Sequence, residues 1–295
     1  RLFEIGIELV SEYIYEMDWI ISFFSDIPTV FRAFILIGGV VVFWVLEGVL
    51  PLFSFQYKKI NHAGLNLFFT LTTAIIGFGL ATLLLITSDF VATNQFGLIY
   101  LVDMSLWAQL IVGLLLMDLI GAYCAHLIEH KVKWMWKFHL VHHSDKNIDV
   151  TSGLRHHPGE TLIRIGFTLI AVLIVGAPMW LIMIYQSLSV LFAHITHANI
   201  NFPKKWDSAL SYVFVTPLMH KVHHHFQRPL TDRNFGNIFS IWDRLFGTYA
   251  QVEDTKKLIY GVDTHMESVE NESLGNLLKI PFQPHRESDE HNPID

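Results

Sequence analysis

Long apolar segments constrain this chain more than any other feature of its sequence. Residues 31–53, 65–87 and 106–127 are each long enough to cross a bilayer, which takes about 20 consecutive apolar residues. A fourth segment, residues 161–198, is too long for one crossing and is interrupted by Gly176-Ala177-Pro178. Proline removes a backbone donor and disfavours helix in the residue before it. We therefore predict a helical hairpin in 161–198, as two full spans or as a shallow, tilted pair.

The composition agrees with a membrane protein. Of the 295 residues, 52% are hydrophobic and 16% are charged, whereas a soluble domain carries about 25% charged residues. The formal net charge is -7, and no basic segment interleaves with aromatic residues, which argues against nucleic-acid binding. Cys124 is the single cysteine, so an internal disulfide and a cysteine-based zinc cluster are both excluded.

The apolar segments divide the chain into three regions. Residues 1–30 combine apolar positions at helical spacing with several acids, which predicts an amphipathic, interfacial segment. Residues 31–250 are expected to form a membrane-embedded domain, and residues 251–295 an acidic, partly disordered tail. The fold class that follows is an all-α integral membrane bundle of about four transmembrane helices plus interfacial helices.

Lysines near the predicted spans give an orientation. The pair at 58–59 and the later Lys131, Lys133 and Lys137 lie on one side of the membrane if the spans alternate, and the opposite loop, 88–105, has no Lys or Arg. The positive-inside rule assigns the lysine side to the cytoplasm. The histidine clusters fall on the same side, so we expect a cytoplasmic, histidine-rich helical region that caps the bundle.

Histidines gather in five short clusters, which are HLIEH (126–130), HLVHH (139–143), RHHPGE (155–160), HITH (194–197) and HKVHHH (220–225). Residues three and four apart share one face of a helix, so H-x-x-H-H places three imidazoles on one stripe. Neutral imidazole is the commonest side-chain metal ligand and suits Fe, Zn, Cu and Ni. Eight to ten histidines exceed what one ion accepts. The spacing therefore predicts two metal ions, each held by four or five imidazoles.

Alternative roles for the histidines fit the sequence less well. The zinc-peptidase signature HExxH and the Glu-x-x-His pattern of carboxylate-rich di-iron bundles are missing. Unmetallated buried clusters would leave polar nitrogens unsatisfied, at a cost of about 1–3 kcal/mol each, although isolated histidines such as His62 and His285 are expected to be ordinary interfacial residues. A metal-binding or transport membrane protein without redox turnover remains the alternative, and iron content together with an O2-dependent product would distinguish the two.

The order HLIEH, HLVHH and, after a hairpin, HKVHH resembles the three-box pattern of the fatty acid hydroxylase / sterol desaturase superfamily. Further similar motifs are RHHPGE, the HAN at 197–199 and the closing NFGNIFSIWDRLFGTY at 234–249. The resemblance covers residues 60–250. One departure is Leu127, where many members have arginine after the first histidine, and this departure bears on the subfamily rather than on the metal site.

This resemblance implies a non-haem centre of two iron ions (Fe2+/Fe3+) that uses O2 to oxidise a C–H bond of a membrane lipid. Hydroxylation of a fatty acyl, sterol or ether lipid is the expected outcome, with desaturation as the alternative, and zinc is expected to replace iron on overexpression because it binds more tightly. The implied ligands are His126, His130, His139, His142, His143, His157, His197, His220, His223 and His224.

Two further expectations accompany the implied centre. Four polar residues are candidates for orienting the imidazole N–H groups, namely Asp118, Asn199, Asn234 and Asp243. The sequence shows no flavin, nicotinamide or cytochrome domain, so the electrons are expected from a separate donor such as a ferredoxin, a cytochrome or a reductase.

Overall fold

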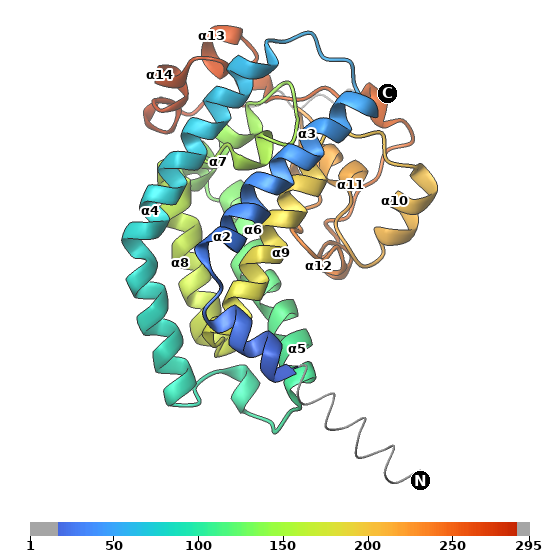
Figure 1. The fold of residues 1–295 in the computed structure, drawn as a ribbon. Coiled ribbons are helices and arrows are strands. Elements are labelled where there is room, and N and C mark those ends of the chain that lie inside the picture. The colour runs from blue at the N-terminus through green and yellow to red at the C-terminus, as the bar shows by residue number, and fades with distance from the viewer. Residues whose placement is uncertain (1–16, 288–295) are drawn as a thin grey trace.

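The structure is a computed structural model that describes residues 17–287. Within this range it is helical and has no β-strand, only three isolated β-bridges, which confirms the predicted fold class (Figure 1). Residues 17–25 are helical. Residues 1–16 of the predicted N-terminal segment and residues 288–295 of the predicted tail lie outside the described range.

The α-helices are α2 (Thr29–Ala33), α3 (Gly39–Val49), α4 (Lys59–Thr93), α5 (Leu106–Asp118), α6 (Ala125–Lys131), α7 (Lys133–His143), α8 (Pro158–Val175), α9 (Met179–His197), α10 (Lys204–Leu210), α11 (Pro217–His223), α12 (Ile241–Leu245), α13 (Ser268–Asn271) and α14 (Leu274–Leu277). Two π-helical segments join neighbouring helices without a break, η1 (Phe34–Gly38) between α2 and α3 and η3 (Leu119–Cys124) between α5 and α6. The short 3-10 turns are η2 (Leu98–Tyr100), η4 (Ser152–Leu154), η5 (Leu230–Asp232), η6 (Thr255–Lys257), η7 (Asp263–His265) and η8 (Ile280–Phe282).

Five helical segments in the described range are long and apolar enough to cross a membrane, and these are Thr29–Val49, Lys59–Tyr100, Leu106–Lys131, Pro158–Val175 and Met179–His197. The interrupted segment 161–198 thus forms two helices, α8 and α9, each long and apolar enough to span a membrane. Long apolar side chains cover the outer surface of the bundle, as Phe78 on α4 illustrates with 87% of its surface exposed. Such a surface is unfavourable in water and suits contact with lipid.

The turn between α8 and α9 depends on two glycines. Gly176 ends α8 in the left-handed region with φ of 81°, and Pro178 directly precedes α9. Gly97, also at positive φ, approaches so closely that a Cβ there would collide with the Gly176 backbone. The largest core of the bundle lies beside this turn, where Val175, Leu181 and Met117 are fully buried. Packing at this end fixes α5, α8 and α9 relative to one another.

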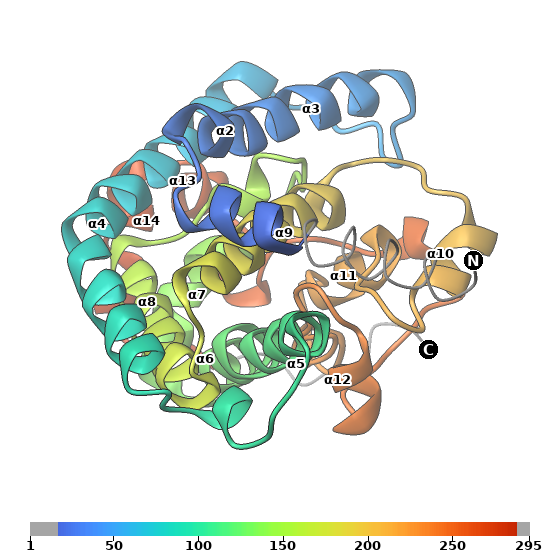
Figure 2. The ribbon, with the colours of Figure 1, turned by 60° about the horizontal axis from the view of Figure 1, so that its bottom comes forward.

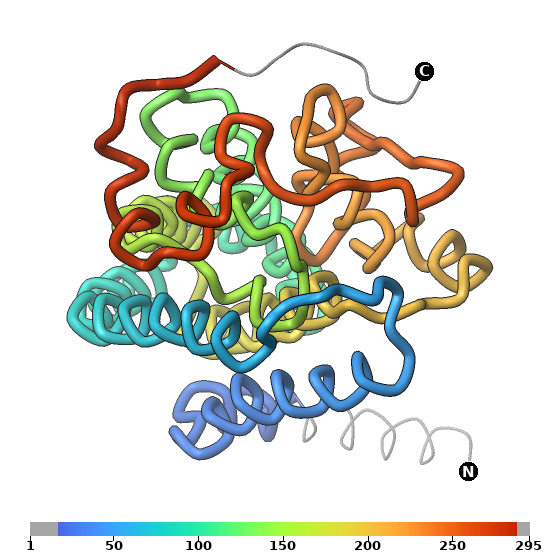
Figure 3. Tube along the Cα trace, turned by 90° about the horizontal axis from the view of Figure 1, so that it is seen from above, coloured from blue at the N-terminus to red at the C-terminus, as the bar shows by residue number. Residues whose placement is uncertain are grey.

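The opposite end of the bundle carries the histidine motifs. The helices α6, α7 and α11 meet there (Figure 2), and the chain after residue 251 folds over α7 (Figure 3). Leu277 and Ile280 of that chain are buried against Leu140 and Val141 of α7. The described part of the acidic tail, residues 251–287, therefore shares a hydrophobic core with the second histidine motif.

Candidate metal centre

Four helices deliver the histidines. His126 and His130 lie one turn apart on α6, and His139, His142 and His143 lie on the last turns of α7. His197 is the last residue of α9. His220 and His223 lie on α11, and His224 follows directly as its C-cap. Every one of these side chains is buried. Motifs up to a hundred residues apart in sequence therefore meet at one end of the bundle.

The imidazoles form two groups, each with ring nitrogens within 4.8 Å of one another. The first group contains His126, His130, His139, His143 and His223, and the second contains His142, His197, His220 and His224. The groups are adjacent, since the ring centroids of His143 and His224 are 4.6 Å apart. Nine of the ten predicted ligands are thus brought together, as five plus four.

The two H-x-x-H-H motifs divide between the groups in a reciprocal way. In the motif of α7, the i,i+4 pair His139 and His143 joins the first group and His142 joins the second. In the motif of α11, the i,i+4 pair His220 and His224 joins the second group and His223 joins the first. Residues four apart stack along one helix face, whereas the third histidine points to the side. Each motif therefore bridges both groups.

The donor set fits a metal ion in each group. His126 donates from Nδ1 to the Phe235 carbonyl at 2.9 Å, and His139 donates from Nδ1 to Glu160 at 2.8 Å. These bonds leave a lone pair on each Nε2, and the two Nε2 atoms face each other at 3.0 Å. Two lone pairs repel unless a cation lies between them. In the second group, Nε2 of His197 likewise faces Nε2 of His220 at 3.0 Å.

Burial keeps these imidazoles neutral. It lowers the pKa of His139 to about 3, although the Glu160 carboxylate opposes the shift. Burial and the neighbouring imidazoles lower the pKa values of both His142 and His224 well below the ordinary value for histidine. A neutral ring has a lone pair to give, and deprotonated ligands are what metal binding requires.

The first group is the one backed by carboxylates. His139 is bonded to Glu160, and His130 Nδ1 lies 3.2 Å from Asp232 Oδ1. His223 Nδ1 donates to the Arg233 carbonyl at 2.7 Å. In the second group, His197 Nδ1 donates to a backbone acceptor, the Ala193 carbonyl, at 2.9 Å. Such partners fix the tautomer and orientation of a ligating ring and raise its basicity.

The four polar residues expected to orient imidazoles bond elsewhere. Asp118 accepts from the backbone of Ile238 and Phe239 and from the Trp242 indole, and Asp243 accepts from the backbone of Phe235 and Gly236. Asn199 and Asn234 bond to backbone groups of Phe53, Met219 and Ala250. Asp243 holds Phe235, whose carbonyl receives the His126 N–H, and Asn234 is the neighbouring residue of that loop. Their influence on the rings is therefore indirect.

His157 lies outside both groups, in contrast to the expectation from its motif. Its Nδ1 accepts the Gly159 N–H at 3.0 Å, so the side chain caps the start of α8. Its neighbour His156 stacks on His142 with ring centroids 4.9 Å apart and bonds to Glu160. Within RHHPGE, Glu160 is the residue that contacts a grouped histidine by a hydrogen bond, and it receives bonds from His139, His156 and Arg164.

Lys221 is a second residue that the motif spacing did not indicate. It is fully buried between two histidines of the third motif, and its ammonium donates to the carbonyls of Thr196, His197 and Ala198, the last at 2.7 Å. These carbonyls end α9, where the helix dipole favours a cation. The bonds join α11 to the end of α9 and so align His197 with His220. Histidine spacing carries no signal for this role, because the contacts of Lys221 arise only in the folded chain.

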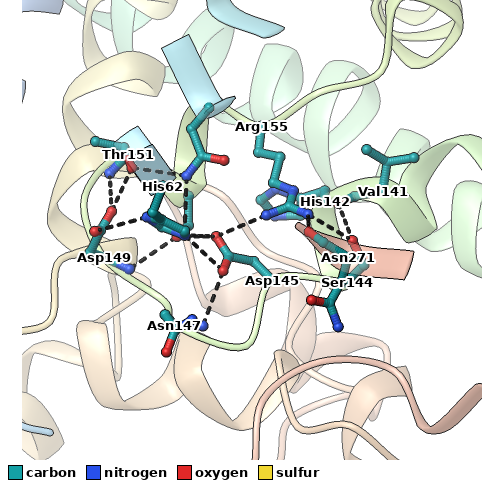
Figure 4. Close-up of polar contacts among 12 residues, drawn as sticks. His62, Val141, His142, Ser144, Asp145, Asn147, Asp149, Thr151, Arg155 and Asn271 are labelled. Carbon is teal, nitrogen blue, oxygen red and sulfur yellow. Dashed lines mark hydrogen bonds and ion pairs between the residues drawn. The ribbon is translucent and has the colours of Figure 1, made fainter. Parts of the chain in front are cut away.

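A polar network around His62 supports the second motif from outside (Figure 4). His62 Nε2 lies 2.8 Å from Asp145, two residues after His143, and His62 Nδ1 lies 3.2 Å from Asp149. The buried Arg155 reaches Asp145 and donates to Ser144 and to the Asn271 carbonyl. Burial alone would raise the pKa of Asp145, but His62 and Arg155 outweigh it and lower that pKa. His62 was expected to be an ordinary interfacial residue. In the structure it is a largely buried residue that holds two aspartates.

The fold and this site define a class of protein, a helical membrane protein with a buried all-histidine site suited to two metal ions. Residues 110–248, which include all nine grouped histidines, match the fatty acid hydroxylase family. This region therefore matches the family that the motifs resemble, which confirms the resemblance.

Three relatives illustrate the match. The chain is 30% identical over 141 residues to an ornithine lipid hydroxylase of Rhizobium tropici, covering 48% of this chain and 41% of the relative. It is 27% identical over 149 residues to the human alkylglycerol monooxygenase, covering 49% and 31%. It is 30% identical over 193 residues to a fatty acid hydroxylase of Lecanicillium, covering 60% and 53%. The chain thus spans about half or less of the length of these relatives. No solved structure matches the chain.

Proposed function

We propose that this protein uses O2 to hydroxylate a C–H bond of a membrane lipid at a di-iron centre held by nine histidines. The observation that carries the proposal is the pair of adjacent, buried, all-histidine groups at one end of a helical bundle that has five helices able to span a membrane. Names of relatives support the reaction class, since they include a lipid hydroxylase and an alkylglycerol monooxygenase. A fatty acyl, sterol or ether lipid is the proposed substrate class.

The need for a metal follows from the chemistry of the substrate. An alkyl C–H bond offers neither an acidic proton for a general base nor an electrophilic carbon for a nucleophile. Bound iron would supply the one-electron and O2 chemistry that side chains lack. The five-histidine group would hold one ion through His126, His130, His139, His143 and His223, and the four-histidine group the other through His142, His197, His220 and His224.

The surrounding residues have roles of their own. Glu160 and Asp232 keep His139 and His130 in one tautomer, so that Nε2 faces the centre. Arg164 links two buried carboxylates, bonding to Glu160 at 2.9 Å and to Glu129 at 2.7 Å. The apolar helices hold the lipid substrate in the bilayer while the imidazoles remain at the bundle end. The lysines near this end orient it toward the cytoplasm, where a ferredoxin, cytochrome or reductase would supply electrons.

Comparative lipidomics tests this proposal. Membranes with and without the protein are compared for lipids heavier by one oxygen or lighter by two hydrogens, with His142→Ala as the inactive control. A gain of one oxygen that requires O2 and intact His142 supports hydroxylation, and a loss of two hydrogens indicates desaturation instead. If purified protein with two bound irons, reductant and O2 leaves every lipid of a total extract unchanged, the oxidation proposal is wrong and metal storage or transport takes its place.

A further inference from the structure

Two stretches, residues 211–215 and 234–246, flank the third histidine motif. The sequence did not predict where in the bundle they lie. Asp118 accepts the N–H groups of Ile238 and Phe239 and the indole N–H of Trp242, at 3.1–3.2 Å. Asp118 lies inside the span Leu106–Lys131, thirteen residues before its last residue. At 1.5 Å per residue, this places the three donors on the order of 20 Å below the histidine-bearing end of the span.

Other contacts place this segment at membrane depth too. Ile238 is fully buried in the same core as Met117 and Leu181 of the spanning helices. The ring of Phe246 stacks on Tyr123 of the same span at 5.4 Å, and the ring of Phe214 lies 5.6 Å from Phe192 of α9. In Figures 1 and 2, α12 lies beside the α5–α6 span. Both halves of the segment therefore contact spanning helices below their ends.

Several side chains at this level face outward and are apolar. Leu245 is 69% exposed, Tyr212 67%, Phe246 53% and Val213 46%. The stretches 210–215 and 234–242 contain no charged residue. This outward face is continuous with the spanning helices, because Phe246 rests on Tyr123 and Phe214 on Phe192. Exposure of this apolar face to water would be unfavourable in free energy, whereas contact with lipid would not be.

Several backbone N–H groups of these stretches are hydrogen-bonded within the protein, as contact with lipid requires. Val215 donates to Ile238 at 2.9 Å, Ser240 donates to Val213 at 3.0 Å, and Phe246 donates to Trp242 at 2.9 Å. Arg244 lies between the rings of Tyr212 and Tyr249, 4.7 and 3.9 Å from their centroids, and bonds to the Ser211 carbonyl. Irregular backbone is tolerated at membrane depth only where protein satisfies it, and aromatic residues with a flanking Arg are typical of the membrane interface.

We propose that the stretches 211–215 and 234–246, which flank the third histidine motif, form a re-entrant element that reaches from the histidine-bearing end into the lipid leaflet and contacts lipid through Tyr212, Val213, Leu245 and Phe246. The occupant of this surface is the bilayer itself at its headgroup–acyl boundary. The inference concerns membrane topology and holds whether or not the protein oxidises lipids. It adds a lipid-contacting wall to the five spanning helices, on the side where Phe235 and Asp232 hold the first histidine group.

Site-directed spin labelling tests this placement. In a Cys124→Ala background reconstituted in phosphatidylcholine vesicles, labels are attached at Leu245→Cys and Val213→Cys, where exposed side chains leave room for them. Collision with O2, which concentrates in lipid, is compared with collision with the water-soluble complex Ni-EDDA. Phe78→Cys on α4 is the matched lipid control, and Val269→Cys on α13, an apolar residue 74% exposed outside the spans, is the matched aqueous control.

The expected result is an O2-to-Ni-EDDA ratio at Leu245→Cys and Val213→Cys close to that at Phe78→Cys and several-fold above that at Val269→Cys. A ratio equal to that of Val269→Cys would overturn the proposal, because the face would then meet water. Low accessibility to both reagents would also overturn it, since that result indicates a protein partner. Loss of the lipid signal at Phe78→Cys alone would contradict the bundle's membrane orientation, on which the proposal rests.

Discussion

Nδ1 of His139 lies 2.8 Å from Oε1 of Glu160, and the same oxygen also receives bonds from His156 and Arg164. Both partners of the His139–Glu160 bond are fully buried or nearly so. One carboxylate thus connects a candidate metal ligand to α8, the helix that begins the hairpin. The position of the first histidine group therefore depends on a residue outside every H-x-x-H motif.

Glu160→Gln should weaken metal binding by 10- to 100-fold, as loss of an imidazole-orienting carboxylate typically does. The amide keeps the size of the side chain but loses the charge that His139 and Arg164 require. Iron titration with a competing chelator measures the change. Glu270→Gln is the matched control, because Glu270 pairs with Arg286 at the surface, and its affinity should equal that of the wild type. Equal affinity in Glu160→Gln would remove Glu160 from the centre.

His130→Ala and His142→Ala should each lower bound metal, one through the five-histidine group and the other through the four-histidine group. We expect a fall from two ions toward one per chain in each variant, measured by elemental analysis of purified protein. In the double variant the remaining ion should also be lost. His285→Ala, an exposed histidine outside both groups, should keep two ions. Retention of two ions in both single variants would refute the assignment of ligands to groups.

Gly39→Ala should destabilise the bundle by about 1–3 kcal/mol, the usual cost of overpacking a core. A Cβ at this position of α3 would collide with the imidazole of the buried His194 on α9. The midpoint of thermal unfolding in detergent, followed by size-exclusion chromatography, measures the effect. Gly77→Ala on α4 meets nothing within 4 Å and should unfold no earlier than the wild type, because alanine favours helix over glycine. Equal midpoints for both variants would mean that α3 does not pack on His194.

His62→Leu should destabilise the protein by about 3–5 kcal/mol, because it leaves Asp149 as a buried charge without a cationic partner and leaves Asp145 with Arg155 alone. Burial raises the pKa of Asp149, but the bonds from His62 outweigh it and lower that pKa overall. The pairing of ionised Asp149 with His62 therefore stabilises the fold fully above about pH 4, and this stabilisation is lost as the pH falls through the lowered pKa of Asp149. Urea unfolding at pH 7 and at pH 3.5 should show the gap between wild type and variant narrowing in acid. A gap that widens in acid would contradict this pairing.

The sequence predicted the helical membrane fold and the meeting of the histidine motifs because both depend on periodicity. Apolar length marked the helices around Leu181 and Phe78, and i,i+4 spacing marked the pairs His126–His130 and His139–His143. Residues that act across the fold carried no such signal. Asp232 and Lys221 contact their partners only through tertiary structure. His157 shares a motif with Glu160 and His156, which contact grouped histidines, yet its own side chain caps a helix. The lipid-facing segment near Leu245 was hidden because its polar backbone is satisfied by Asp118, far away in sequence.

The second histidine group takes three of its four members from His197 onward, and the first group needs His223. Neither half of the centre is complete until the ribosome has synthesised α11, when five imidazoles of α6 and α7 have already been made. If each group holds an ion as proposed, neither ion can have its full set of ligands until the chain has been made past the hairpin of α8 and α9 and through α11. A chain that stops before residue 223 would leave the imidazoles of α6 and α7 without the ligands that would complete either group.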